Sequence, residues 1–141
     1  MDNFTLDIKK WADKTEKGLV ETNEAALVEL NSRIIYETPV DKGQHRGAWT
    51  ASIGSPSFGS GIDKSGNKTV GKANAVASKA PGHVYYLSNN APAIRKLEYG
   101  EFTTKASTDK TINGYSKQAP QGMVRKAFKE LKREIDSVKT K

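Results

Sequence analysis

The stretch "TPVDKGQHRGAW", residues 38–49, lies between a long helical pattern and the first strand pattern of the chain. A residue that precedes proline is driven out of helical dihedral angles, so the helix must end beside Pro39. Asp41 is placed to accept backbone hydrogen bonds in a turn, and Gly43 permits a positive φ. Arg46 is expected to pair with Asp41 or with the helix C-terminus, and Trp49 to enter the sheet. These five residues predict a structural joint.

The same stretch has a chemical alternative, in which Asp41, His45 and Arg46 act as an acid, a base and an anion clamp. The joint explains Asp41 and Arg46 without catalysis and leaves only His45 unassigned. The second histidine, His83, is too distant in sequence to complete a recognisable metal-binding spacing. No metalloprotease, serine-hydrolase or phosphate-loop motif occurs, so no catalytic, cofactor or metal site is expected and the chain is predicted not to be an enzyme.

Upstream of the joint, apolar and small residues recur every three or four positions over residues 4–37. This spacing predicts one long N-terminal helix within the first 37 residues, weakened near its middle by Gly18. The members of the stripe are Phe4, Ile8, Trp11, Thr15, Leu19, Thr22, Ala26, Leu30 and Ile34.

Downstream of the joint, local patterns predict four further elements. Residues 47–54 and 83–90 are expected to be strands, because they are rich in aromatic and β-branched residues. Residues 91–100 predict a short helix that ends at Gly100. Residues 119–139 predict a C-terminal helix with an apolar stripe on a basic background. The predicted class is α+β, with the N-terminal and C-terminal helices packed on a small antiparallel sheet.

The segment 55–82 is rich in Gly, Ser, Lys and Asn and has few large apolar residues. Its length exceeds that of usual connections, so it is expected to be a flexible arm or an extended hairpin. In the hairpin alternative, "KTVGKANAVAS" (68–78) forms the returning strand. The residues expected to make interface contacts on this arm are Phe58, Ile62, Lys64, Lys68 and Lys72. A second polar connection, residues 101–118, contains a turn-like "ING".

Length and composition predict a single domain over residues 1–141 with a modest core. The chain has no cysteine, no apolar run long enough for a membrane span and no export signal, so we expect a cytosolic origin and no membrane partner. The net charge is +7, divided as −3 over residues 1–37 and +10 over residues 38–141. Such asymmetry is typical of nucleic-acid contact or of complementary faces in an assembly.

Two other features have competing interpretations. Glu98 in "KLEYG" has the chemistry of a general base, but we expect an acid near a helix end that pairs with an arginine. Tyr85, Tyr86 and Tyr99 have rings that stack on bases, but we favour half-buried sheet residues. The basic charge of the predicted C-terminal helix is compatible with contacts to nucleic-acid phosphates. The sequence around it lacks the helix-turn-helix or zinc-finger motif that would make nucleic-acid binding a specific prediction.

Three motifs in order resemble a family of bacteriophage proteins. "TPVDKGQHRGAW" after a long helix, "YYLSNNAPAIRKLEYGEF" and "QAPQGMVRKAF" are similar to segments of the tail-completion, or head–tail joining, proteins of long-tailed phages. The similarity runs from Thr38 to Phe128. It places Pro39, Val40, Asp41, Gly43 and Arg46 in the first motif. The second motif takes in Glu98, Tyr99 and Gly100.

The resemblance implies a structural virion protein of the phage neck, made in the host cytoplasm. It implies a homo-oligomeric ring, hexameric in this family, that completes or terminates the tail tube. Expected partners are the tail tube protein and a head–tail connector or stopper protein, with transient contact to phage DNA in the lumen. The lean core and the split charge agree with a protomer that gains stability from its neighbours.

Two rival functions remain open from sequence alone. A basic nucleic-acid-binding module would show a steep salt dependence of DNA binding. A small nuclease would require Asp41 or His45 for turnover in a variant that still folds.

Overall fold

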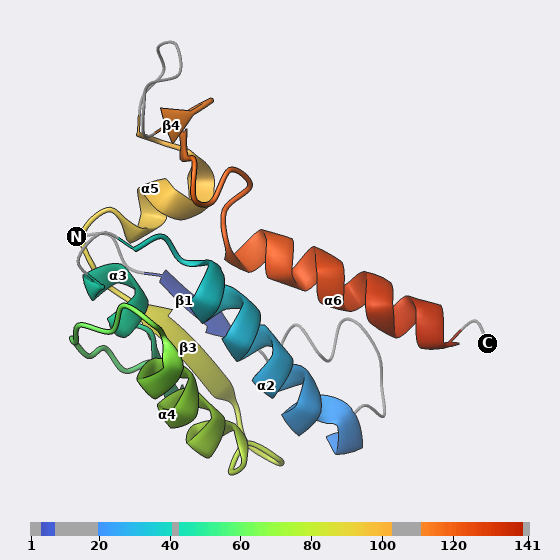
Figure 1. The fold of residues 1–141 in the computed structure, drawn as a ribbon. Coiled ribbons are helices and arrows are strands. Elements are labelled where there is room, and N and C mark those ends of the chain that lie inside the picture. The colour runs from blue at the N-terminus through green and yellow to red at the C-terminus, as the bar shows by residue number, and fades with distance from the viewer. Residues whose placement is uncertain (1–3, 8–19, 41–42, 103–110, 140–141) are drawn as a thin grey trace.

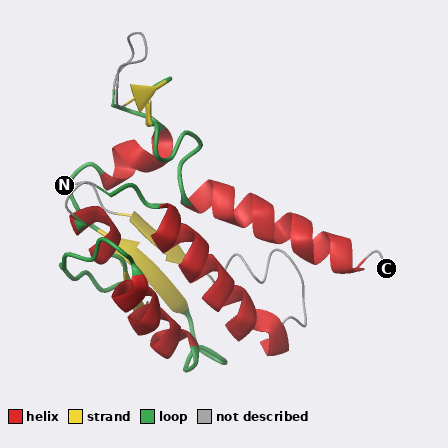
Figure 2. Ribbon diagram, viewed as in Figure 1, coloured by secondary structure: helices red, strands yellow, loops and turns green. Residues whose placement is uncertain are grey.

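The computed structural model describes residues 4–7, 20–40, 43–102 and 111–139. Within these ranges the fold is mixed α and β, with five helices and two antiparallel sheets (Figures 1 and 2). In the larger sheet β3 (Tyr85–Asn89) is central, between β1 (Phe4–Asp7) and β2 (Thr50–Ile53). The smaller sheet pairs β4 (Thr111–Ile112) with β5 (Tyr115–Ser116). The predicted combination of helices with small antiparallel sheets is therefore confirmed.

Three helices make up most of the helical layer. Helices α2 (Val20–Glu37) and α4 (Asn67–Ala77) lie side by side, and α4 also contacts β2 (Figure 1). Helix α6 (Val124–Lys139) packs on α2, so its principal neighbour is a helix and not the sheet that was expected. The short helices α3 (Gln44–Gly47) and α5 (Ile94–Tyr99) each follow a turn at a joint described below.

Helix α2 confirms the C-terminal half of the predicted N-terminal helix. Leu30 and Ile34 are almost completely buried, as the three-to-four-residue spacing predicts, and Leu27 and Ile35 are buried beside them. Burial of each such side chain contributes about 1.5–3 kcal/mol relative to exposure. The helix ends at Glu37, immediately before the residue that precedes Pro39.

The start of the chain corrects the prediction of a continuous helix over residues 4–37. Residues Phe4–Asp7 form a strand that pairs antiparallel with β3, with Phe4 opposite Asn89 and Asp7 opposite Tyr86. The sequence Phe-Thr-Leu-Asp alternates apolar and polar residues, so it fits a strand as well as the first step of a helical stripe. Pairing with a buried central strand decides between the two. The predicted helical residues 8–19 lie outside the described residues.

The segment 55–82 corrects a second prediction. Residues 67–77, expected as a returning strand within an arm, form α4. Val70, Ala73 and Ala77 are buried on one face of this helix. Their small side chains let α4 lie close to α2 and β2, so the segment packs without the large apolar residues whose scarcity indicated an arm. Only the exposed loop 54–62, which comes before α4, keeps an arm-like character.

The other predicted elements are confirmed within narrower bounds. Strands β2 and β3 and helices α5 and α6 lie inside the predicted ranges 47–54, 83–90, 91–100 and 119–139. The turn-like "ING" joins β4 to β5 through Asn113 and Gly114, both at positive φ. Tyr85 lies in the sheet, as favoured, but it is fully buried and not half-buried. Its hydroxyl donates a hydrogen bond of 2.9 Å to Asn31 Oδ1 on α2.

Candidate functional site: two structural joints and an exposed loop

The first joint connects the end of α2 to the start of β2. Trp49 is buried and its Nε1 donates a hydrogen bond of 2.8 Å to the Thr38 hydroxyl. Thr38 Oγ1 in turn donates to the Ile34 carbonyl at 2.6 Å. Thr38 and Pro39 are both buried. Trp49 was predicted to enter the sheet, but β2 begins one residue later, at Thr50, and Trp49 packs in the core. Thr38 is the partner that the sequence did not indicate.

Arg46 ties the joint to a distant loop. Its Nη2 donates to the carbonyls of Tyr36 at 2.7 Å and Thr38 at 2.9 Å, at the C-terminal end of α2. Its Nη1 donates to the Lys64 carbonyl at 2.7 Å. The predicted pairing of Arg46 with the helix C-terminus is therefore confirmed. Asp41, the alternative partner, lies outside the described residues.

His45 has a structural role of its own. Its Nε2 lies 2.5 Å from the Pro92 carbonyl, and because a carbonyl only accepts, Nε2 must carry the proton. The backbone carbonyl of His45 accepts a hydrogen bond of 2.8 Å from Asn89 Nδ2. Asn89 Oδ1 then accepts from the Ala91 amide at 2.8 Å. His45 thus fixes α3 to the end of β3, and in this state its ring offers no basic nitrogen at Nε2.

Two glycines let the joint approach the loop that leads into α4. Gly43 has φ 90°, and a Cβ there would lie 3.0 Å from the backbone nitrogens of Asp63 and Lys64. A Cβ on Gly47 would lie 2.6 Å from the Gly61 carbonyl oxygen, closer than real Cβ contacts allow. The Asp63 amide donates to the Gly43 carbonyl at 3.1 Å. The predicted role of Gly43 is confirmed, and the close partner of the joint is residues 61–64.

Asp63 holds the entry to α4 and was not singled out from the sequence. Its Oδ2 accepts hydrogen bonds of 2.8 Å from both the amide and the hydroxyl of Thr69. Its Oδ1 accepts from the Gly66 amide at 3.0 Å and the Ser65 hydroxyl at 3.2 Å. Burial raises the pKa of Asp63, but these hydrogen bonds outweigh burial and lower the pKa to about 2. The motif Asp-Lys-Ser-Gly-Asn is the local pattern that points to such a turn.

We expect Asp63 to make stability depend on acid pH. The pKa of this carboxyl is lower in the folded protein than in the unfolded chain. Its ionised form therefore stabilises the fold at pH values above the ordinary pKa of aspartate, and this stabilisation is lost as the pH falls toward 2. The loss should be about 1–2 kcal/mol between pH 5 and pH 2, after allowance for partial exposure. Urea unfolding at several pH values measures it. Asp63→Asn, the matched control, should be less stable at pH 6 and should lack this part of the pH dependence; an unchanged profile would contradict the assignment.

The second joint fixes the start of α6 through Glu98, which is 1% exposed. Glu98 Oε1 accepts hydrogen bonds of 2.8 Å from the amides of Met123 and Val124. Its Oε2 accepts from the Arg125 amide at 3.1 Å and from Arg125 Nε at 2.9 Å. The expectation that Glu98 pairs with an arginine near a helix end is confirmed, and every one of these bonds is structural.

Neighbouring residues complete the second joint. The Tyr99 ring lies between two guanidinium groups, with Arg95 at 4.9 Å and Arg125 at 4.8 Å from the ring centroid. Tyr99 is 38% exposed, so it is neither a buried sheet residue nor a free stacking platform. Gly100 ends α5 in the left-handed region with φ 69°, as predicted. A Cβ there would overlap the Tyr115 ring.

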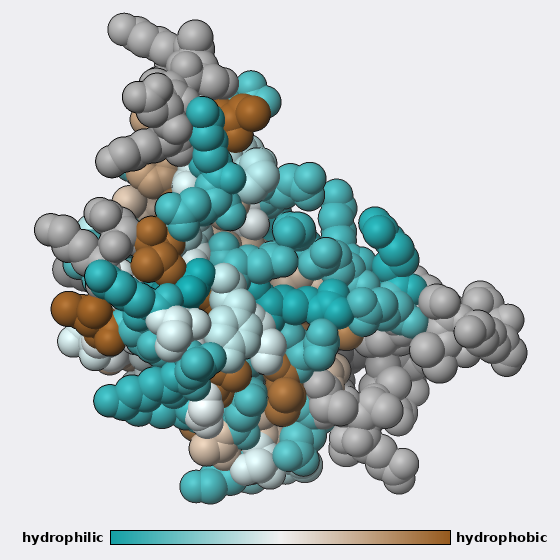
Figure 3. Space-filling model, in the orientation of Figure 1, coloured by the Kyte–Doolittle hydropathy of each residue, from teal (hydrophilic) through white to brown (hydrophobic). Residues whose placement is uncertain are grey.

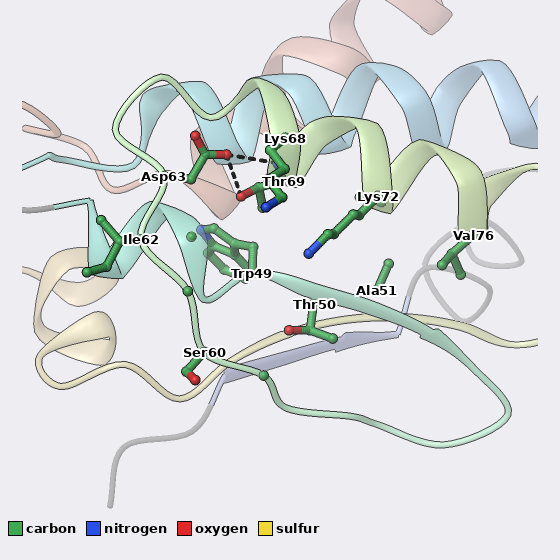
Figure 4. A pocket seen from close by; sticks show the side chains of 14 residues that line it. Trp49, Thr50, Ala51, Ser60, Ile62, Asp63, Lys68, Thr69, Lys72 and Val76 are labelled. Atoms are coloured by element: carbon green, nitrogen blue, oxygen red, sulfur yellow. Dashed lines mark hydrogen bonds between the residues drawn. The ribbon is translucent and has the colours of Figure 1, made fainter.

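The loop 54–62 is exposed throughout and borders a hollow of about 410 Å³. Figure 4 shows β2 and α4 on one side of the hollow, the loop around Ser60 on the other, and Lys72 directed into the space. Ile62 is 75% and Phe58 40% exposed, and Lys64, Lys68 and Lys72 are exposed as well. The five residues predicted to make interface contacts are therefore all accessible, three of them on or beside the loop and two on α4.

Within the described ranges, no three His, Asp or Glu side chains gather where a metal ion could be held. Also within them, no helix combines the length and apolar character that crossing a membrane requires. His45 and Arg46 are directed to different backbone carbonyls, and Asp41, the third residue of the catalytic alternative, lies outside the described residues.

Comparison with known protein families, with curated proteins and with solved structures finds no match for this chain. The resemblance to phage tail-completion proteins therefore depends on the three motifs in the sequence. Residues of the first motif form the first joint, and residues of the second and third motifs meet in the second joint.

Proposed function

We propose that this protein is a structural component of a phage neck, which assembles as a homo-oligomeric ring and completes or terminates the tail tube. The observation that carries the proposal is that the exposed large apolar side chains of the described residues form two groups, apart from Tyr36 at the end of α2, whose hydroxyl donates to Asn67 Oδ1. The loop surface comprises Phe58 and Ile62, and the hairpin surface comprises Tyr99, Phe102 and Ile112. Figure 3 shows hydrophobic side chains both near β4 and beside the loop between β2 and α4.

Two unlike surfaces suit a subunit with two kinds of neighbour. A closed ring needs a head-to-tail contact, and a ring in a stack also needs an axial contact. We assign the loop surface to the neighbouring copy. The hairpin surface, which stands off the main body beside α5 in Figure 1, suits the tail tube protein or the connector or stopper protein. The hexameric state follows from the resemblance alone.

The motif residues support a structural role over an enzymatic one. Arg46 makes hydrogen bonds that hold the C-terminal end of α2, and Glu98 accepts hydrogen bonds that hold the N-terminal end of α6. His45 donates to a backbone carbonyl. His45, Arg46 and Glu98 therefore each have a structural role in the fold.

Electron microscopy of the purified chain, with and without tail tubes, tests the proposal. We expect rings that cap tubes, and a monomer that ignores tubes would overturn it. Ile62→Asp should abolish rings in light scattering, because it places a charge in an apolar contact. Ile112→Asp should leave rings intact but lower tube capping at least about tenfold, as expected for an interface anchor. Ser78→Asp adds the same charge at another exposed position and serves as the control.

Nucleic-acid binding is the second candidate, favoured by a row of exposed lysines along α4. Lys64, Lys68, Lys72 and Lys79 are exposed, and among the described residues no acidic side chain forms an ion pair with them. If this row contacts DNA, Lys68→Gln/Lys72→Gln should reduce the log–log salt slope of duplex binding by about 2. Lys117→Gln/Lys129→Gln is the control, and equal slopes for the two double variants would exclude a specific role of α4.

A further inference from the structure

One edge of the larger sheet carries unpaired backbone groups. Strand β2 is the outer strand beside β3, and the Gly54 amide donates to the Val84 carbonyl at 2.9 Å. Because bonded and non-bonded pairs alternate in an antiparallel ladder, Thr50 and Ser52 also face β3. Ala51 and Ile53 therefore direct their N–H and C=O groups away from β3. Within the described ranges, no backbone group is hydrogen-bonded to this outer edge.

The adjoining loop carries a second set of unpaired backbone groups. Between Gly54, held by Val84, and Asp63, held by Gly43, no backbone–backbone hydrogen bond is made by residues 55–62 to any described residue. The only bond to this backbone from a described side chain is from the Ser52 hydroxyl to the Ser55 carbonyl. Residues 56–62 have neither helix nor strand assignment, and the loop bears the exposed side chains of Phe58 and Ile62. Among the described residues, this segment therefore has no backbone partner.

The hollow lies between these two sets of groups. Thr50 and Ala51 of β2 line it on one side and Gly59 to Ile62 on the other (Figure 4). The loop approaches β2 near Gly59, where a Cβ would lie 3.0 Å from Thr50 Oγ1, yet it does not join the sheet. The sequence of residues 55–62 has no charged side chain, so Lys68 and Lys72 at the hollow would not repel a second such segment.

We propose that the outer edge of β2 accepts loop 55–62 of a second copy of this chain as an added strand. Among the described residues of each subunit, the outer edge of β2 and the backbone of loop 55–62 both lack backbone partners, so head-to-tail addition satisfies both around a closed ring. Main-chain hydrogen bonds to Ala51 and Ile53 supply the contact, and Phe58 and Ile62 supply apolar burial. The inference builds on the proposed ring and names the contact that closes it.

Hydrogen exchange at single-amide resolution tests this in the unmodified protein. In rings, the amides of Ala51 and Ile53 should exchange about 100-fold more slowly than in the monomeric variant Phe58→Asp/Ile62→Asp. The Ser52 amide, bonded to β3 in both states, is the internal control. Rings in which Ala51 and Ile53 remain unprotected would overturn the inference while leaving the proposed function intact. Absence of rings at every concentration would overturn both.

Complementation distinguishes addition between copies from closure of the loop within one copy. Ala51→Pro removes an outward N–H, which an edge strand tolerates, so this chain loses the accepting edge but keeps the loop. Phe58→Asp/Ile62→Asp keeps the edge but loses the loop. Native mass spectrometry should show each variant alone as a monomer and their mixture as a one-to-one dimer. The inference would be overturned if Ala51→Pro formed rings by itself. It would also be overturned if the two variants were folded but formed no dimer when mixed. If Ala51→Pro does not fold, the exchange experiment decides.

Discussion

Replacing Glu98 by alanine should lower the free energy of unfolding by about 3–5 kcal/mol, the largest loss that we expect from a single substitution in this chain. The carboxylate is buried and accepts from the amides of Met123, Val124 and Arg125 and from the Arg125 side chain. Removal of the Glu98 carboxylate leaves the first backbone amides of α6 buried without hydrogen-bond acceptors. Each buried donor without an acceptor lowers the free energy of unfolding by about 1–3 kcal/mol. Urea or guanidinium unfolding followed by circular dichroism measures the loss.

Two further variants separate the parts of this interaction. Glu98→Gln keeps one acceptor oxygen for Met123 and Val124 but sets an amide group against Arg125, so we expect a loss of about half that of alanine. Arg125→Ala removes a half-exposed partner and should cost about 1 kcal/mol. A Glu98→Ala protein as stable as the unmodified chain would show that the carboxylate does not anchor α6.

Elements governed by one dominant local pattern could be predicted from the sequence. Helix α2 has a stripe of large apolar residues and a proline that stops it, and β3 begins with two consecutive tyrosines directly after Val84. Helix α5 ends at a glycine in the left-handed region. In each case propensity, apolar spacing and boundary residues agree, and tertiary packing only confirms what they indicate.

The two wrong elements are those where local patterns conflict. Residues 4–7 fit a helical stripe and an alternating strand equally, and only pairing with β3 selects the strand. Residues 67–77 have buried alanines in place of large apolar residues, so their helical face is visible only once α2 and β2 are adjacent. Tertiary context overrides weak local preference in both cases.

At the candidate site, the sequence identified important side chains more successfully than it identified their hydrogen-bond partners. Arg46 and Glu98 were expected to satisfy helix ends, but Lys64 and the amides of Met123 and Val124 come from segments distant in the chain. Asp63 was missed because its turn lies in a polar segment whose following helix was not predicted. Partners that only the fold brings together are not encoded by spacing.

Replacing Arg46 by alanine should lower the free energy of unfolding by about 2–3 kcal/mol, the second large loss that we expect. The guanidinium satisfies the carbonyls of Tyr36 and Thr38 at the end of α2 and of Lys64 beyond the exposed loop. Hydrogen bonds from a charged donor contribute more than neutral ones, and a methyl group replaces none of them. Denaturant unfolding measures the loss.

Arg46→Lys separates charge from geometry at this site. A lysine keeps the positive charge but lacks the planar guanidinium that donates to carbonyls of two segments at once. The Arg46→Lys variant should therefore recover less than half of the stability lost in Arg46→Ala. Because Arg46 joins the end of α2 to Lys64, its removal should also release the C-terminal end of the loop that carries Phe58 and Ile62. The free energy of ring assembly should then fall by more than the free energy of unfolding of the Arg46→Ala variant does, because the released loop must become ordered again on binding. Equal effects of alanine and lysine on stability, with assembly unchanged, would show that Arg46 acts only through its charge and does not position the loop.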